Sequence, residues 1–170
     1  MTDIIAAPRA AVVRSDGEYR LVTNQAVPAR TLLFTLEGEL TTTPTRYTVQ
    51  LDERRHVDLP AGCPLEEVLD RYYWRFMNHA CEPAAVIRGR SVFSLRPIPA
   101  WSEITFHYAS TEYDMAEPFT CRCGSDRCDG VVQGFRHLPG DRREALRPLL
   151  SPYLLAVLDG RTAEPAGACR

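Results

Sequence analysis

The sequence predicts one mainly β domain of the α+β class, built from several small sheets of short strands. In its first third, short β-branched and apolar runs alternate with turn residues, and helical periodicity is confined to two later stretches. A length of 170 residues suits a single hydrophobic core. The contents of 45% hydrophobic and 25% charged residues are those of an ordinary globular domain.

The first third is expected to consist of strands joined by turns. Asp16-Gly17 lies between two β-branched runs and predicts a hairpin turn. Residues 37–39 and the polar residues 41–45 are expected to be connections. The expected strands cover residues 10–13, 19–22, 31–36, 47–51 and 54–58.

The spacing of apolar residues changes after Pro64. Apolar positions then recur at helical spacing, which predicts a short helix over residues 65–73. A hairpin formed by residues 86–87 and 92–95, a strand over 103–106 and a loop over 109–120 are expected to follow.

Leucines at helical spacing dominate the stretch from 141 to 158. They predict one helix, or two with a break at Ser151-Pro152, packed on the domain itself. Dimerisation through this segment is the alternative to a monomer. The tail over 161–170, rich in Ala, Gly and Pro, is expected to be disordered.

Charge and hydropathy disfavour two classes of partner. The net charge is −2, so no strongly basic face for nucleic acid is indicated. No apolar run approaches the roughly 18 residues of a membrane span, and the N-terminus lacks a secretion signal. A cytoplasmic protein is expected, with export by a non-classical route as the alternative. All 20 basic residues are arginine, and the sequence contains no lysine.

Cysteines gather in the last third of the sequence. Cys121, Cys123 and Cys128 lie within eight residues, a grouping typical of thiolate metal ligands in a reduced protein. Tetrahedral zinc needs a fourth ligand. Cys81 and His137 are both candidates for it, and His107 is a weaker one.

Three motifs appear in a fixed order. Arg-Phe-x-Asn-His-x-Cys-x-Pro covers residues 75–83, Ile-Thr-Phe-x-Tyr covers 104–108, and Cys-x-Cys-Gly-x3-Cys covers 121–128. In isolation, an Asn-His pair or a tyrosine is more often structural than functional. Together the motifs resemble the paired signature and the post-SET zinc motif of SET-domain protein-lysine methyltransferases, over roughly residues 17–130.

The resemblance implies an architecture. It implies a SET-domain fold with a knot-like active site over residues 9–112 and a zinc-binding post-SET segment over 113–136. A C-terminal helical segment over 137–160 would follow. In this family the upstream cysteine of the first motif completes the zinc site, so the implied ligands are Cys81, Cys121, Cys123 and Cys128.

The resemblance also implies S-adenosylmethionine as cofactor and a lysine of a protein as substrate. Tyr108 is the implied catalytic residue, which orients the amine, and Phe119 would cover the adenine. Phe106 is implied in the lysine channel, where the lack of a hydroxyl leaves room for di- or trimethyl lysine. The residues implied in cofactor binding are Glu18, Tyr19, Arg20, Tyr47, Arg75, Phe76, Asn78, His79, Tyr108 and Phe119.

The sequence departs from the family pattern at four places. Glu18-Tyr19-Arg20 stands where the family has Gly-x-Gly, and Ala80, Ala84 and His107 replace a serine, an asparagine and an aspartate. Two alternatives therefore accompany the enzyme. One is a SET-like binding module without catalysis, and the other is an interaction protein in which zinc is purely structural.

Overall fold

The computed structural model describes residues 9–166, which form short strands, short α-helices and single 3-10 turns. The strands are β1 (Ala10–Ser15), β2 (Glu18–Thr23), β3 (Leu32–Thr35), β4 (Glu39–Thr41), β5 (Val49–Gln50), β6 (His56–Asp58), β7 (Asn78–His79), β8 (Ala85–Arg88), β9 (Ser91–Ser94), β10 (Thr105–Phe106), β11 (Phe119–Thr120) and β12 (Val131–Val132). The α-helices are α1 (Leu65–Asp70), α2 (Gly140–Ala145) and α3 (Pro152–Leu158), and the 3-10 turns are η1 (Tyr73–Phe76), η2 (Tyr108–Ser110), η3 (Phe135–His137) and η4 (Arg147–Leu149). The predicted class, mainly β with small sheets, is confirmed.

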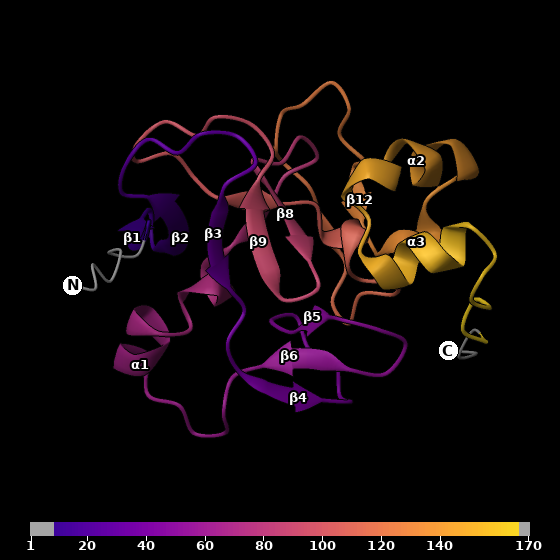
Figure 1. The fold of residues 1–170 in the computed structure, drawn as a ribbon, viewed down its shortest axis with the longest axis horizontal. Helices are drawn as coiled ribbons and strands as arrows, with labels where there is room; N and C mark the ends of the chain where they lie inside the picture. Colours follow the sequence, from indigo (N-terminus) through magenta and orange to yellow (C-terminus); the bar gives the residue numbers. More distant parts are fainter. Residues whose placement is uncertain (1–8, 167–170) are drawn as a thin grey trace, which may run out of the picture.

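The centre of the molecule is the antiparallel sheet β3-β9-β8 (Figure 1). Gly89 turns the β8–β9 hairpin with φ of 60°, a conformation that glycine adopts without steric cost. Ile87 and Val92 are fully buried on this sheet. They belong to a core that draws on residues from Ala10 to Phe106.

Two peripheral sheets flank the central one. Strands β1 and β2 form the predicted hairpin, with Asp16 and Gly17 both at positive φ. The sheet β4-β6-β5 includes β4, which the sequence analysis assigned to a turn and a polar connection, so that assignment was wrong. Two polar residues and one exposed leucine form this strand because β6 supplies antiparallel backbone partners for them. Gly38 is required before β4, since a Cβ atom there would lie 2.2 Å from the carbonyl oxygen of Asp58.

The two motif segments meet as a parallel pair of strands. Asn78 of β7 faces Thr105 of β10, and His79 faces Phe106. These strands are 25 or more residues apart in sequence, and pairing them brings the Asn-His motif beside the Ile-Thr-Phe-x-Tyr motif.

The C-terminal helical segment packs on its own domain. The predicted break is confirmed, because α3 begins at Pro152 and the Ser151 hydroxyl accepts the N–H of Leu154. Leu146, Leu150 and Leu154 are buried with Phe135 in a second apolar cluster (Figure 1, right). The Arg88 guanidinium of β8 donates to the carbonyls of residues 148–150 and ties this segment to the central sheet.

The tail and the surface complete the fold. Glu164, in the stretch expected to be disordered, accepts hydrogen bonds from Tyr113 at 2.6 Å and Arg143 at 2.7 Å. Residues 167–170 of that stretch lie outside the described residues.

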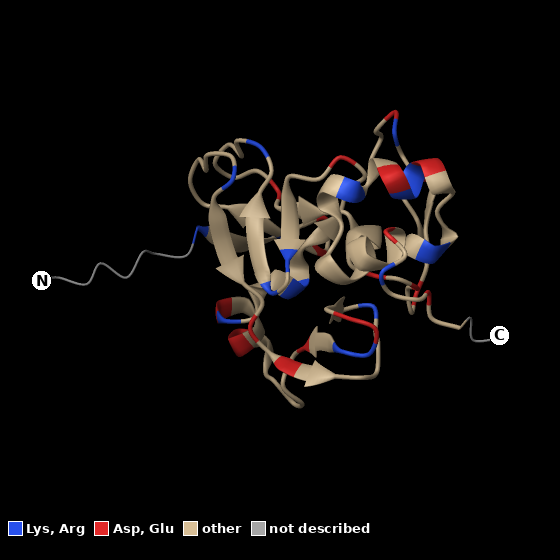
Figure 2. Ribbon diagram, turned by 45° about the vertical axis from the view of Figure 1, so that its right-hand side comes forward, with Lys and Arg blue, Asp and Glu red and all other residues tan. Residues whose placement is uncertain are grey.

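Positive and negative segments are interspersed in the view of Figure 2. Within residues 9–166, no helix is both long and apolar enough to cross a bilayer.

Candidate functional site

A cleft of about 670 Å³ lies between the two motif segments, residues 75–83 and 104–108, and the cysteine loop, residues 121–128. Its volume is within the range of about 300–1,000 Å³ that small-molecule sites occupy. The cleft brings together most of the residues implied in cofactor binding or catalysis, namely Glu18, Arg20, Tyr47, Arg75, Asn78, His79, Phe106, Tyr108 and Phe119.

Two implied residues lie elsewhere. Tyr19 and Phe76 are absent from the cleft lining, and their rings pack on each other with centroids 5.0 Å apart. The alternation of side chains along β2 explains this, because Glu18 and Arg20 point to one face of the strand and Tyr19 to the other.

Tyr108 is fixed on every side. Its hydroxyl donates to the Met77 carbonyl at 2.9 Å, and its backbone N–H donates to Nδ1 of His79 at 3.1 Å. The rings of Phe106 and Phe119 lie 4.8 and 5.9 Å from its ring. Burial raises the pKa of Tyr108, so the phenol stays protonated at neutral pH.

His79 is held neutral beside this ring. Burial, and then the neighbouring His107, lower the pKa of His79 to about 3. Because Nδ1 accepts the N–H of Tyr108, the ring proton of neutral His79 is on Nε2, which lies 3.2 Å from the sulfur of Cys81. The imidazole of His79 therefore connects the backbone of Tyr108 to the cysteine cluster.

Two arginines and a tyrosine form the opposite rim of the cleft. Tyr47 lies between two guanidinium groups, with that of Arg75 at 3.9 Å and that of Arg46 at 5.1 Å from its ring centroid. Arg46 also forms an ion pair of 3.7 Å with Glu117, which lines the cleft as well. The rim joins the loop before β5 to the segment before the cysteines.

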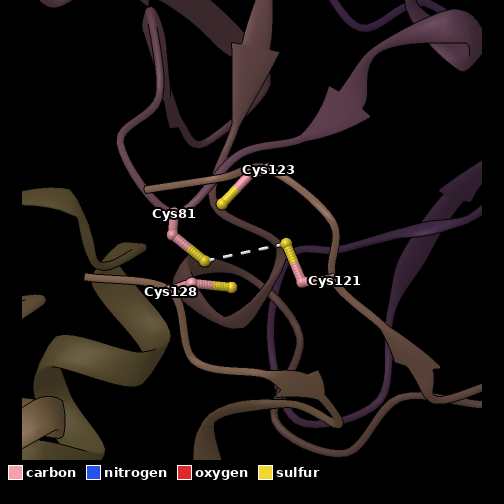
Figure 3. A group of neighbouring side chains, drawn as sticks. All are labelled: Cys81, Cys121, Cys123 and Cys128. Atoms are coloured by element: carbon pink, nitrogen blue, oxygen red, sulfur yellow. Dashed lines mark hydrogen bonds between the residues drawn. The ribbon is translucent and has the colours of Figure 1, made fainter. Parts of the chain in front are cut away.

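Four cysteines converge at the end of the cleft (Figure 3). The sulfurs of Cys81, Cys121, Cys123 and Cys128 all lie within 4.8 Å of one another, and those of Cys81 and Cys121 are 3.9 Å apart. A tetrahedral ion with metal–sulfur bonds of about 2.3 Å would space its sulfurs by about 3.8 Å. The donor set and its spacing fit zinc.

Local backbone shapes this cluster. Gly124 adopts φ of 72° between the second and third cysteines of the loop, and the N–H of Cys121 donates to the Gly130 carbonyl at 2.7 Å. Backbone N–H groups also point at sulfur, from Asp129 to Cys81 and from Gly130 to Cys128, each at 3.4 Å. The N–H of Ser125 in turn lowers the pKa of Cys123 to about 6. At Cys123 this donor favours the thiolate, which is the form that binds metal, whereas burial raises the pKa of the Cys81 and Cys121 thiols.

The two histidine candidates have other partners. Nε2 of His137 is 2.8 Å from Asp114, and Nε2 of His107 is 2.9 Å from Asp129. Of the three candidates for the fourth ligand, Cys81 is therefore the one that lies with the other three cysteines. It also lies within 4.8 Å of the ring nitrogens of His79 and His107.

Sequence reasoning missed a buried network behind the cysteines. Asp129 has a side chain only 5% exposed and accepts from His107 on one oxygen and from Arg142 of α2 on the other, the latter at 3.0 Å from Nε. Arg142 also donates to the Arg127 carbonyl. The position of Asp129 beside Cys128 was a usable signal, whereas Arg142 looks like every other helix arginine in the sequence. Glu112 was missed as well; it lines the cleft and belongs to no motif.

Comparison with known proteins defines the class. The SET domain family model matches residues 18–109, more than half of the chain. This chain belongs to the SET domain family.

Several relatives are methyltransferases. Methyltransferase flvH of Aspergillus flavus is 33% identical over 105 residues, which cover 59% of this chain and 56% of that protein. Histone-lysine N-methyltransferase SETD2 of Homo sapiens is 37% identical over 68 residues, covering 35% of this chain and 3% of that protein. The chain thus spans about half or much less of the length of these relatives.

A solved structure supports the fold. The crystal structure of KRYPTONITE in complex with mCHG DNA and SAH superposes with a TM-score of 0.53 at 20% identity, covering 72% of this chain and 28% of that one. At that identity the match speaks for the fold alone, and it agrees with the SET-domain architecture.

Proposed function

We propose that this chain is an S-adenosylmethionine-dependent protein-lysine N-methyltransferase that can proceed beyond the monomethyl product. The observation that carries the proposal is the cleft itself, in which a protonated, fixed tyrosine hydroxyl lies among aromatic rings beside four convergent thiols. Membership of the SET domain family and relatives named histone-lysine N-methyltransferases support it.

The residues present fit the cofactor. The guanidinium groups of Arg20 and Arg75 line the cleft and can meet a carboxylate, and the half-exposed ring of Phe119 offers a stacking face for adenine. When bound, S-adenosylmethionine supplies a methyl group on a sulfonium. Glu18 and Arg20 stand where the family has glycines, and both line the cleft.

The chain's own residues orient the reacting groups and exclude water from them. Because the hydroxyl of Tyr108 donates its hydrogen bond to the Met77 carbonyl, the oxygen lone pairs remain free to orient an amine or a methyl group. Phe106, only 5% exposed, and the ring of Tyr108 exclude water and disfavour an ammonium ion next to them. The unhydroxylated ring of Phe106 also leaves space for an amine that already carries methyl groups.

The cysteine cluster would hold zinc as a structural ion. Cys81 follows β7 and the other three follow β11, so the metal would fix the Phe119 wall of the cleft against the motif strands. Loss of the metal would therefore open the site.

Radiolabelled methyl transfer onto a panel of proteins and short lysine peptides tests the proposal. Tyr108→Phe is expected to lower the rate by about 100-fold or more while cofactor affinity changes little, because the ring and its packing remain. The absence of lysine in the chain removes automethylation as a background. Mass spectrometry of the product at full conversion reads the methylation state, and monomethyl lysine alone would refute the second half of the proposal.

Calorimetry with S-adenosylmethionine separates the two other functions. A zinc-stabilised interaction protein binds none. A SET-like binding module binds the cofactor but transfers no methyl group to any member of the panel.

A further inference from the structure

A buried carboxyl group lies on the cleft wall one turn beyond Tyr108. Glu112 is 9% exposed and lines the same cleft as that tyrosine. Its backbone N–H donates to the Tyr108 carbonyl at 3.0 Å, and its carbonyl accepts the N–H of Phe135 at 2.9 Å. The main chain on which this carboxyl group is mounted is therefore fixed from both sides.

The two oxygens of this carboxyl group have different surroundings. Oε1 accepts the backbone N–H of Gln50 at 2.8 Å and the hydroxyl of Thr111 at 3.2 Å. Oε2 accepts no hydrogen bond from the described residues. The side-chain atoms that lack a partner and are also sealed from solvent belong to His56, His107 and Tyr153, so Oε2 is not one of them. One oxygen orients the group and the other remains free and reachable.

No cation of residues 9–166 forms an ion pair with Glu112. Four of the charged groups around the cleft have other contacts: Arg46 pairs with Glu117, Arg75 stacks on Tyr47, and Glu103 accepts from Asn78. Arg122 lines the cleft as well. Glu18 and Arg20 lie on β2, where they line the cleft. A buried carboxylate without a counter-ion is costly, so the site favours a cationic ligand or a bound proton.

Burial raises the pKa of Glu112 to about 7, with the hydrogen bonds from Gln50 and Thr111 opposing the shift. A carboxyl group that exchanges its proton near neutral pH has the acidity that proton transfer at that pH requires. A lysine ammonium in water, with a pKa near 10.4, does not give up its proton there unaided.

We propose that Glu112 binds the ammonium group of the incoming lysine and accepts its proton. The proposal rests on the proposed methyltransferase function and deepens it. An N–H bond of the ammonium breaks, its electron pair stays on nitrogen, and the proton passes to Oε2. The neutral amine then bonds to the methyl carbon as the carbon–sulfur bond breaks, with that electron pair passing to sulfur. Glu112 returns its proton to water after the product leaves.

Glu112→Gln distinguishes this role from a structural one. Glutamine keeps an oxygen that can accept from Gln50 and Thr111, but it can neither take up a proton nor carry charge. Glu144→Gln, an exposed change on α2, is the matched control for loss of a carboxylate. The probe is a pool of short peptides with one central lysine, together with the same pool carrying norleucine in its place.

The rate is measured from about pH 6 to about pH 10. Glu112→Gln is expected to lower kcat/KM by about 100-fold near pH 7 and to regain most of the loss near pH 10, where the amine deprotonates unaided. Affinity should fall for the lysine pool and stay unchanged for the norleucine pool, which a merely structural role would not produce.

Two results overturn the proposal in distinguishable ways. An unchanged rate, or an equal loss at every pH with both pools bound as before, removes Glu112 from the reaction while methyl transfer by the wild-type chain stands. A wild-type chain that transfers no methyl group to any peptide or protein overturns the proposed function and this proposal with it.

Discussion

The two walls of the cleft are held by different forces. The wall that carries Asn78, His79 and Tyr108 belongs to the main core, where strands β7 and β10 pair and Met77 and Ile104 are buried. The wall that carries Phe119 rests on the two-residue strands β11 and β12 and on exposed or half-exposed cysteines. Apolar burial maintains the first wall, whereas the second would depend on the proposed zinc site at the four sulfurs.

We therefore expect that the wall that carries Phe119 can lose its structure without unfolding the wall that carries Tyr108. A structural zinc site contributes folding free energy only to the chain that closes around it. Substitutions at the two walls should therefore separate metal content from the stability of the core.

Cys81→Ser is expected to have the largest effect. It removes the one sulfur that joins the cysteine loop to β7, so zinc should be lost and methyl transfer should fall below detection. The thermal transition of the core should change much less, because Cys81 is not part of the main apolar cluster. Metal analysis, activity and calorimetry on the same sample test this. Cys63→Ser, outside the group of four cysteines, is the control. Full zinc occupancy in Cys81→Ser would contradict the assignment.

Arg142→Gln is expected to weaken the metal site without removing a ligand. The guanidinium holds Asp129, whose N–H donates to the sulfur of Cys81. Loss of a group that orients metal ligands costs about 10–100-fold in metal affinity. Chelator competition measures this in the absence of substrate.

Arg143→Gln is the matched control for Arg142→Gln. Arg143 lies on the same helix but donates to Leu138, Arg136 and Glu164, away from the cysteine loop. Equal zinc release from both variants would show that the arginine network behind Asp129 is irrelevant to the metal.

The same contrast explains what was predictable from sequence. Short strands, the Asp16-Gly17 hairpin and the helix break at Pro152 follow from local turn and cap chemistry, and the structure has all three. The three motifs identified the family because their side chains serve one compact site. Strand β4 was missed because two of its three residues are polar and its pairing with β6 is a tertiary effect. Arg142 and Glu112 were missed because nothing local distinguishes them, and their partners lie 13 and 62 residues away.

Phe106→Tyr is expected to change the product more than the rate. The ring lies 4.8 Å from that of Tyr108 and is almost fully buried, so an added hydroxyl would narrow the channel on the core wall. The variant should accumulate monomethyl lysine under conditions in which the wild-type chain proceeds further. Mass spectrometry of product ratios at matched conversion is the measurement, and an unchanged ratio would leave Phe106 without a role in product choice.

Arg46→Gln is expected to have the smallest effect, although Arg46 lines the cleft and pairs with Glu117. Both side chains of this pair are about 60% exposed and the atoms are 3.7 Å apart. Exposed pairs of this kind contribute about 0–1 kcal/mol and are screened by salt. Peptide affinity should fall by no more than about fivefold, and the loss should shrink as salt rises. A larger, salt-independent loss would mean that Arg46 contacts the substrate itself. That contact would then help to hold the cleft together in addition to the four sulfurs.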